Sequence, residues 1–328
     1  MRLLFLTDTH IRGTSPRSRT DDYQQTIKRK LLEVKEMVQR NKVDVVLHGG
    51  DVFDRPNLSP AIVRDFVQLF QQFEVPIYAV AGNHDMYGHN PSTLDRTMLG
   101  LLDTLGIIQL LKEGQPIPLE KDGLLVQLSG QAFHFELDHR DRADDYGVTN
   151  EIGADYCIHI VHGMLVDRPL PEGIAYTLIE QLDLPTAADI LLTGHYHAGF
   201  PIHQQNGKYI VNPGALARVN NHPSEIRRIP QVVLIELNDS ISIELIPLST
   251  AEKGENVLDR TYLEQAAYRQ SQFASFAQEI RAIGNFRSVD IAQVIEEIAQ
   301  STDIEPEVKQ ETLRRIAAAQ EAEGNEEK

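Results

Sequence analysis

The 328-residue sequence has one cysteine and no run that approaches twenty apolar residues. The single cysteine, Cys157, excludes an internal disulfide framework, and its place in the apolar run of residues 156–161 predicts a core side chain rather than a nucleophile. The first apolar run, residues 3–6, is too short for a signal peptide or a membrane span and soon meets Asp8. We therefore expect no membrane segment and a cytoplasmic location.

The chain also lacks a surplus of positive charge, since its net charge is −17. That sum argues against a nucleic-acid partner, but the acidity is uneven: residues 1–100 carry 13 basic against 12 acidic side chains. There is also no internal repeat and no phosphate-binding glycine loop of the nucleotide-binding kinds.

Apolar periodicity predicts an α/β fold. Strands are expected at residues 2–7, 43–48 and 77–81, with amphipathic helices between them, and this alternation favours right-handed crossovers and a parallel sheet. Lys28, Arg29 and Lys30 fall on the polar face of the first helix and are expected to be solvated. Further predicted elements are a helix at 93–105, strands at 124–128, 156–161, 190–193 and 208–211, and two strands at 231–236 and 242–247 at the edge of a second sheet.

From about residue 252 the apolar spacing is helical only. We expect a catalytic domain over residues 1–250, a helical C-terminal region over 251–320 and a disordered charged tail over 321–328. The apolar faces of these helices could dock on the catalytic domain or bind a partner's helices, and the sequence leaves both open.

Five predicted strands finish in residues that can bind a metal ion. These residues are Asp8 with His10, Asp51, Asn83, His162, and His195 with His197. A single such residue is more often a turn former or a hydrogen-bonded structural residue. Agreement at five strand ends, expected on one side of one sheet, favours ligation instead. Carboxylate, imidazole and amide oxygen suit Mn, Fe or Zn, and one carboxylate such as Asp51 can bridge two cations about 3.5–4 Å apart.

As a set, these motifs resemble those of the calcineurin-like metallophosphoesterase superfamily, over roughly residues 1–215. The resemblance implies a metallophosphoesterase-type α/β sandwich in which a water deprotonated between two metal ions attacks a phosphate ester. It implies one ion held by Asp8, His10, Asp51 and His197, and a second held by Asp51, Asn83, His162 and His195.

His84 and Asp85 follow the predicted ligand Asn83 directly. The resemblance implies that His84 contacts the phosphate or protonates the leaving oxygen, with Asp85 orienting its ring. An imidazole beside a carboxylate can stay protonated and act as a general acid. A further metal ligand or an ordinary loop histidine is the alternative.

Residues 48–56 and 80–85 also resemble the SbcD-type DNA repair nucleases. That likeness implies a manganese-dependent phosphodiesterase acting on DNA ends in repair or recombination, with an SbcC-type coiled-coil ATPase as partner, a possible homodimer, and Asp54 as an accessory residue. Those relatives usually carry a mixed α/β capping domain, where this chain predicts helices only. DNA would be bound by a small basic patch comprising Arg12, Arg17, Arg19, Arg55 and Arg218, with an affinity that falls steeply with salt.

Two other functions stay open. The enzyme alternative is a phosphodiesterase or phosphatase acting on a small nucleotide or a phosphoprotein. The placing of Arg55 is similar to the Asp-Arg pair of protein serine/threonine phosphatases, although Asp85 stands where those enzymes usually have Glu. The other alternative is a scaffold that binds metal and recruits an ATPase through its C-terminal helices.

Overall fold

The computed structural model describes residues 1–171, 173–259, 261 and 311. The chain divides into two units, Met1–Arg260 and Thr261–Lys328. Nearly all of the second unit, including most of the predicted helical region and the whole predicted tail, lies outside the described residues.

The first of two six-stranded sheets has the order β14-β13-β1-β2-β3-β4. Its parallel strands are β1 (Arg2–Leu6), β2 (Val45–His48), β3 (Ile77–Ala79) and β4 (Gln109–Leu110), and α1 (Tyr23–Arg40), α2 (Pro60–Gln71) and α3 (Met98–Thr104) connect them in sequence. The predicted parallel strand–helix alternation is confirmed.

The last two strands correct the sequence analysis. β13 (Gln231–Leu237) and β14 (Ile241–Pro247) form the antiparallel edge of this first sheet and not of the second. β13 pairs with β1 along the register Arg2↔Glu236 to Phe5↔Val233. Alternating side chains predict a strand but carry no information on its partner, so this pairing was not readable from the sequence.

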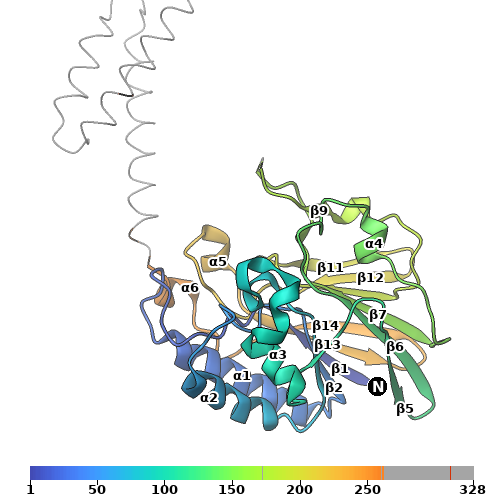
Figure 1. Cartoon of the computed structure of the whole chain (residues 1–328), viewed down its shortest axis with the longest axis horizontal. Coiled ribbons are helices and arrows are strands. Elements are labelled where there is room, and N and C mark those ends of the chain that lie inside the picture. The colour runs from blue at the N-terminus through green and yellow to red at the C-terminus, as the bar shows by residue number, and fades with distance from the viewer. Residues whose placement is uncertain (172, 260, 262–310, 312–328) are drawn as a thin grey trace, which may run out of the picture. The chain divides into compact units, whose positions relative to one another are not determined.

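The second sheet has the order β11-β12-β10-β7-β6-β5. Its strands are β5 (Ile117–Lys121), β6 (Leu124–Gln131), β7 (Tyr156–Val161), β10 (Ile190–Thr193), β11 (Phe200–Gln205) and β12 (Lys208–Asn212). Figure 1 shows the two sheets lying against each other, with α1, α2 and α3 on the outer side of the first. The metal-competent strand ends therefore come from two sheets, and the expectation of a single sheet is wrong.

Alternation along β1 explains the layers. Leu3 and Phe5 pack with Ile158 and Ile190 between the two sheets, whereas Leu4 and Leu6 pack with the helices. Each of these four β1 side chains is at most 2% exposed. Burial of a side chain of this size contributes roughly 1.5–3 kcal/mol, so the sandwich fixes β1 from both faces.

The remaining elements are short. They are η1 (Asn83–Asp85), η2 (Tyr87–His89), η3 (Pro91–Arg96), α4 (Arg142–Tyr146), β8 (Leu165–Val166), β9 (Thr177–Leu178), η4 (Ile179–Gln181), α5 (Pro223–Arg227) and α6 (Gly254–Val257). The helix predicted at 93–105 is a 3-10 turn followed by α3, because Thr97 breaks the run and caps α3 by accepting from the Gly100 N–H. Among the described residues, no helix has the length and apolar character needed to cross a membrane.

Candidate metal centre

The carboxyl ends of strands from both sheets meet at one place. Asp8 follows β1 and Asp51 follows β2, while His162 follows β7 and His195 follows β10. Backbone hydrogen bonds join adjacent loops: the Asp8 N–H donates to Gly50 O at 3.0 Å. Ligands in α/β folds are expected at the carboxyl ends of strands, and here the sandwich brings two such edges together.

Four of these loop residues have left-handed backbone conformations. The φ angles are 52° at Asp8, 42° at His10, 52° at Asp51 and 73° at His195. For a residue other than glycine this conformation costs on the order of 1–3 kcal/mol and tends to cluster at functional sites. The fold therefore holds four side chains in place at a local cost, which indicates a function for them.

The predicted ligands form two groups that share the Asp51 carboxylate, and a third group, His10, Asp54 and His84, shares His10 with the first. Ligand atoms of Asp8, His10, Asp51 and His197 all lie within 4.8 Å of one another, and those of Asp51, His162 and His195 do the same. Asn83 Oδ1 is 3.2 Å from His162 Nε2, beside the second group. The structure thus brings all seven predicted ligands together. Their assignment to individual ions remains a prediction.

The chemistry of this cluster fits divalent cations. Asp51 Oδ2 and His10 Nδ1 are buried and have no hydrogen-bond partner. His10 Nε2 and His197 Nε2 lie 3.0 Å apart, which brings two ring nitrogens against each other. His162 Nδ1 donates to Gly49 O at 2.7 Å, so that its other nitrogen faces the cluster. A divalent metal coordinated here would satisfy Asp51 Oδ2, whereas His10 Nδ1 faces away from the cluster toward Asp54. The geometry does not fix the identity of the metal.

Electrostatics keep two carboxylates and one imidazole of the centre in forms that can bind metal. Burial alone would raise the pKa of Asp51, but the nearby His162 outweighs it and holds that pKa well below its usual range. The pKa of Asp8 is likewise lowered against the effect of burial, chiefly by its interaction with His197. Burial lowers the pKa of His10 to about 3, which leaves its imidazole neutral. Two charged carboxylates and a neutral imidazole are competent metal ligands. Against the effect of burial, Asp51 raises the pKa of His162 to about 9 and Asp8 raises that of His197, so a metal ion binding to these two rings would release protons.

Two glycines make the close packing possible. A Cβ on Gly82 would lie 2.1 Å from Asp51 Oδ1, and one on Gly50 would lie 2.3 Å from His162 Nδ1. Gly50 also has a φ of 98°. Only glycine fits at such positions, so these residues define the space that Asp51 and His162 occupy.

Asp85 does not orient the His84 ring as predicted. Its carboxylate accepts hydrogen bonds from three backbone N–H groups, those of Val52, Phe53 and Gly82, at 3.3, 2.9 and 2.9 Å. The ring of His84 instead makes its hydrogen bond to the Asp54 carbonyl, with Nδ1 at 3.0 Å. Asp85 therefore ties the Asp51 loop to the Asn83 loop; burial and the nearby Asp51 raise its pKa to about 7.

Asp54 lies beside the centre and links it to Arg12. Its Oδ1 is 3.7 Å from His10 Nδ1, and its Oδ2 is 3.0 Å from Arg12 Nη1. A carboxylate near the outer nitrogen of a metal-binding histidine orients the ring. His84 lies edge-on to His10 with 4.8 Å between ring centroids, so it is adjacent to the centre.

Two of the five predicted substrate-binding arginines are buried and engaged. Arg19 forms a bidentate pair with Asp21. Arg218 is 2% exposed and donates to the carbonyls of Glu252 and Arg228. These contacts are structural and leave neither guanidinium facing solvent. The prediction was wrong for these two residues because the position of a residue near a loop does not reveal whether its side chain is buried.

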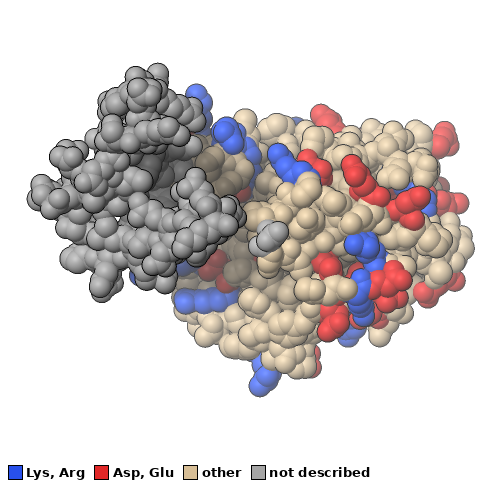
Figure 2. Space-filling view, turned by 90° about the horizontal axis from the view of Figure 1, so that it is seen from above, with Lys and Arg blue, Asp and Glu red and all other residues tan. Residues whose placement is uncertain are grey.

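The other three arginines keep some exposure, with Arg12 partly buried and Arg17 and Arg55 exposed. On the described part of the face in Figure 2, basic and acidic side chains are interspersed rather than gathered in a continuous basic stripe.

Sequence reasoning missed two basic side chains, Lys30 and Arg228, that hold the backbone next to the centre. The predicted solvated residue Lys30 is 1% exposed, and its Nζ donates to Leu216 O at 2.6 Å. Arg228 donates to the carbonyls of Ala215 and Ala217.

The N–H groups of this same segment, residues 215–217, donate in turn to the carbonyls of His197, Thr7 and Asp8. Lys30 and Arg228 thus hold a short backbone segment that positions ligand-bearing loops. Apolar periodicity in the sequence does not signal such contacts. The contact of Lys30 joins residues 186 positions apart in the sequence, and the contacts of Arg228 are made to a loop.

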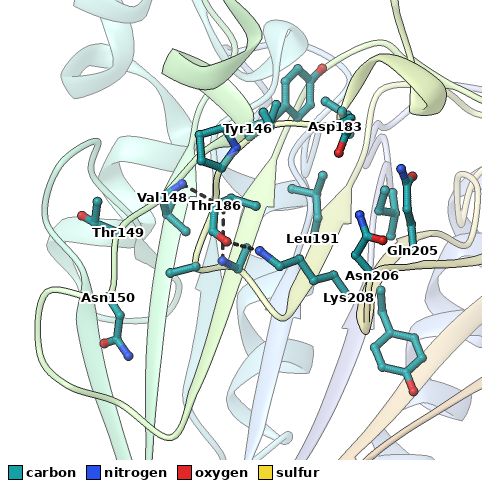
Figure 3. A pocket seen from close by; sticks show the side chains of 17 residues that line it. Tyr146, Val148, Thr149, Asn150, Asp183, Thr186, Leu191, Gln205, Asn206 and Lys208 are labelled. Carbon is teal, nitrogen blue, oxygen red and sulfur yellow. Dashed lines mark hydrogen bonds between the residues drawn. The ribbon is translucent and has the colours of Figure 1, made fainter.

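A sizeable cavity in the described part of the chain lies away from this centre. It has a volume of about 650 Å³ and is lined by residues that include Tyr146, Thr186, Leu191 and Lys208 (Figure 3). It opens near the start of β10 and β12, whereas the metal-competent residues follow the end of β10. None of the seven predicted ligands lines it.

Comparisons with known proteins agree with this geometry. The family model described as calcineurin-like phosphoesterase matches residues 1–199. The chain belongs to this family, and its clustered Asp and His side chains could hold a divalent metal ion.

Two curated relatives are named DNA double-strand break repair protein Mre11. The one from Archaeoglobus fulgidus is 27% identical over 197 residues, which is 56% of this chain and 43% of the relative. The one from Aeropyrum pernix is 30% identical over 219 residues, 60% of this chain and 49% of the relative. The matches thus span less than half the length of either relative. Among solved structures, calcineurin-like phosphoesterase YfkN from Bacillus subtilis is 14% identical, with a TM-score of 0.48, 85% of this chain covered and 98% of that one.

Proposed function

We propose that the protein is a manganese-dependent nuclease that hydrolyses DNA phosphodiesters in repair or recombination. The observation that carries this proposal is the pair of ligand groups sharing the buried Asp51. The Mre11 proteins among its relatives support DNA as the substrate class. Manganese suits the mixed nitrogen and oxygen donors, with no thiolate among them, and Fe or Zn would suit them too.

The residues of the metal centre and its surroundings would have different roles in the reaction. Two cations held by the seven ligands would activate a water and neutralise charge on the phosphate when bound. His84 stands at the edge of the centre, held by its hydrogen bond to the Asp54 carbonyl, where it can donate a proton to the leaving oxygen. Asp54 orients His10, and Arg12 holds Asp54. The exposed Arg17 and Arg55 are left to contact the DNA backbone.

The experiment compares substrates under one set of conditions. Purified protein with Mn²⁺ is incubated with labelled single-stranded and duplex DNA, with cyclic nucleotides and with bis(p-nitrophenyl) phosphate. We expect DNA cleavage that EDTA abolishes. Asp51→Asn is the matched control for the metal centre. Turnover of the small substrates with DNA left untouched would reject the nuclease and leave a small-molecule phosphodiesterase as the second candidate.

Two partners belong to the same proposal. An SbcC-type ATPase would bind the C-terminal region, and the protein would work as a homodimer. Co-purification with such an ATPase, and light scattering of the isolated chain, test these two points separately.

A further inference from the structure

A row of aromatic rings leads from the metal centre to the surface. The Phe133 ring lies 5.8 Å from His195 and 6.3 Å from Phe135, between centroids. On its other side Phe133 lies 6.1 Å from His89, which is 6.2 Å from His84. The row therefore borders the centre from a predicted metal ligand to the candidate proton donor.

The backbone holds this row in place. Phe133 and Phe135 follow β6 closely, and the Phe133 N–H donates to Ala81 O at 3.0 Å, two residues before Asn83. The intervening His134 turns instead to the buried Asp145, with Nε2 2.8 Å from Oδ1. The anchors at Phe133 and His134 thus hold the backbone that carries the two phenyl rings beside the metal centre.

An exposed phenylalanine at this place calls for a function. Phe135 is 59% exposed, and burying a phenylalanine would contribute roughly 1.5–3 kcal/mol. The ring row is continuous with His195 and His84 at the metal centre. A substrate whose phosphate lies at the centre would therefore place its neighbouring group on these rings. The group attached to a phosphate in DNA is a nucleoside, and flat bases stack on aromatic side chains with about 1–3 kcal/mol per base.

We propose that Phe133 and Phe135, together with His89, form a stacking surface for an unpaired nucleobase next to the phosphate at the metal centre. This inference rests on the proposed function and narrows its substrate class. A base within an intact duplex has both faces covered by its neighbours, so the surface selects single strands, frayed ends or splayed bases over continuous duplex.

The test measures dependence on the base. One single-stranded oligonucleotide is compared with a copy in which both nucleosides flanking the cleaved phosphate are abasic tetrahydrofuran residues. The wild-type protein should cleave the base-bearing strand faster in kcat/KM by roughly 5- to 150-fold, the stacking free energy expressed as a rate ratio. Phe135→Leu should shrink that ratio several-fold, and Phe135→Tyr, which keeps the ring, should retain it.

Controls distinguish failure of the stacking surface from failure of the proposed nuclease function. Leu105→Ala removes another exposed apolar side chain, 61% exposed and remote in sequence from the ring row, and should leave the ratio unchanged. If DNA is cleaved with equal rates on both strands, or if Phe135→Leu slows both strands equally, the stacking surface is wrong while the nuclease stands.

If no DNA is cleaved although bis(p-nitrophenyl) phosphate is, the nuclease itself fails. Fluorescence anisotropy with both oligonucleotides, with Ca²⁺ in place of Mn²⁺, then decides the inference, since equal affinities for both strands would overturn it.

Discussion

At the scale of single residues, the centre depends on side chains placed by strained or crowded backbone. Asp51 sits in a left-handed conformation, is buried, and is enclosed by Gly82, whose missing Cβ makes room for the carboxylate. His84 lies just outside this enclosure and is tied only through its ring to the Asp54 carbonyl and through its N–H to Asp51. The two kinds of position predict different consequences of mutation.

His84→Ala should lower kcat by about 10²- to 10⁴-fold, because the proton donor is lost while the other side chains stay in place. Elemental analysis should find nearly unchanged metal content. Loss of one ion would make His84 a ligand, and full function in vivo after this substitution would favour the scaffold alternative.

Gly82→Ala should reduce metal binding and activity severely and destabilise the fold by about 1–3 kcal/mol, because the new Cβ meets both the Asp51 carboxylate and its backbone N at 2.4 Å. Gly88→Ala is the control for loss of a glycine, since its Cβ meets open space; its φ of 57° adds a backbone strain that Gly82, with a φ of −92°, does not have. Thermal unfolding and metal titration of both variants distinguish crowding of Asp51 by the new Cβ from the general effect of replacing a glycine. Similar losses of stability and metal binding in both variants would contradict the steric account.

At the scale of elements, helix α1 supports the site and the fold at two different points. Lys30, on its buried side, holds the carbonyl of Leu216, whose N–H contacts Thr7 O. Glu33, one turn further on, accepts four hydrogen bonds from Ser249 and Thr250 at 2.6–2.8 Å. The first contact bears on activity and the second on stability.

Lys30→Met should lower kcat/KM by up to about 100-fold, because residues 215–217 shift and misplacements of 1 Å in an active site have effects of this size. Lys28→Met is the control on the same helix, since Lys28 pairs with Asp65 on a more exposed part of it. Steady-state kinetics with a soluble phosphodiester checks both. Equal and small changes in kcat/KM for the two variants would mean that residues 215–217 are held in place without Lys30.

Glu33→Ala should lower the free energy of unfolding by about 1–3 kcal/mol at neutral pH. The hydrogen bonds lower the pKa of Glu33 in the folded state, so its contribution is fully present above its usual value near 4.5 and is lost as pH falls through the lowered one. Urea unfolding at several pH values should show the difference between wild type and variant shrinking below about pH 4.5. A difference independent of pH would assign the effect to packing.

At the scale of the whole molecule, the centre lies where the two sheets of the sandwich meet. Its ligands come from strands of both, so a metal ion bound there links the sheets to each other. Asp51 Oδ2 is buried and accepts no hydrogen bond from the protein, so a metal ion would supply the partner that it lacks.

Addition of Mn²⁺ to metal-free protein should therefore raise stability, by about 2.7 kcal/mol when free metal exceeds its Kd a hundredfold. EDTA should remove both this gain and catalytic activity. Differential scanning calorimetry in EDTA and after restoring Mn²⁺ measures the effect. An active protein with no transition metal, indifferent to chelators, would contradict the metal centre altogether.

The sequence by itself determined the parallel strand–helix alternation and the positions of the strand-end Asp, Asn and His residues, because strand period and turn chemistry are local properties. The tertiary structure alone decided that β13 pairs with β1, that Arg218 and Lys30 are buried, and that Asp85 ties two loops together instead of orienting His84. Those outcomes depend on contacts between segments distant in the chain, and local side-chain patterns carry no record of such partners.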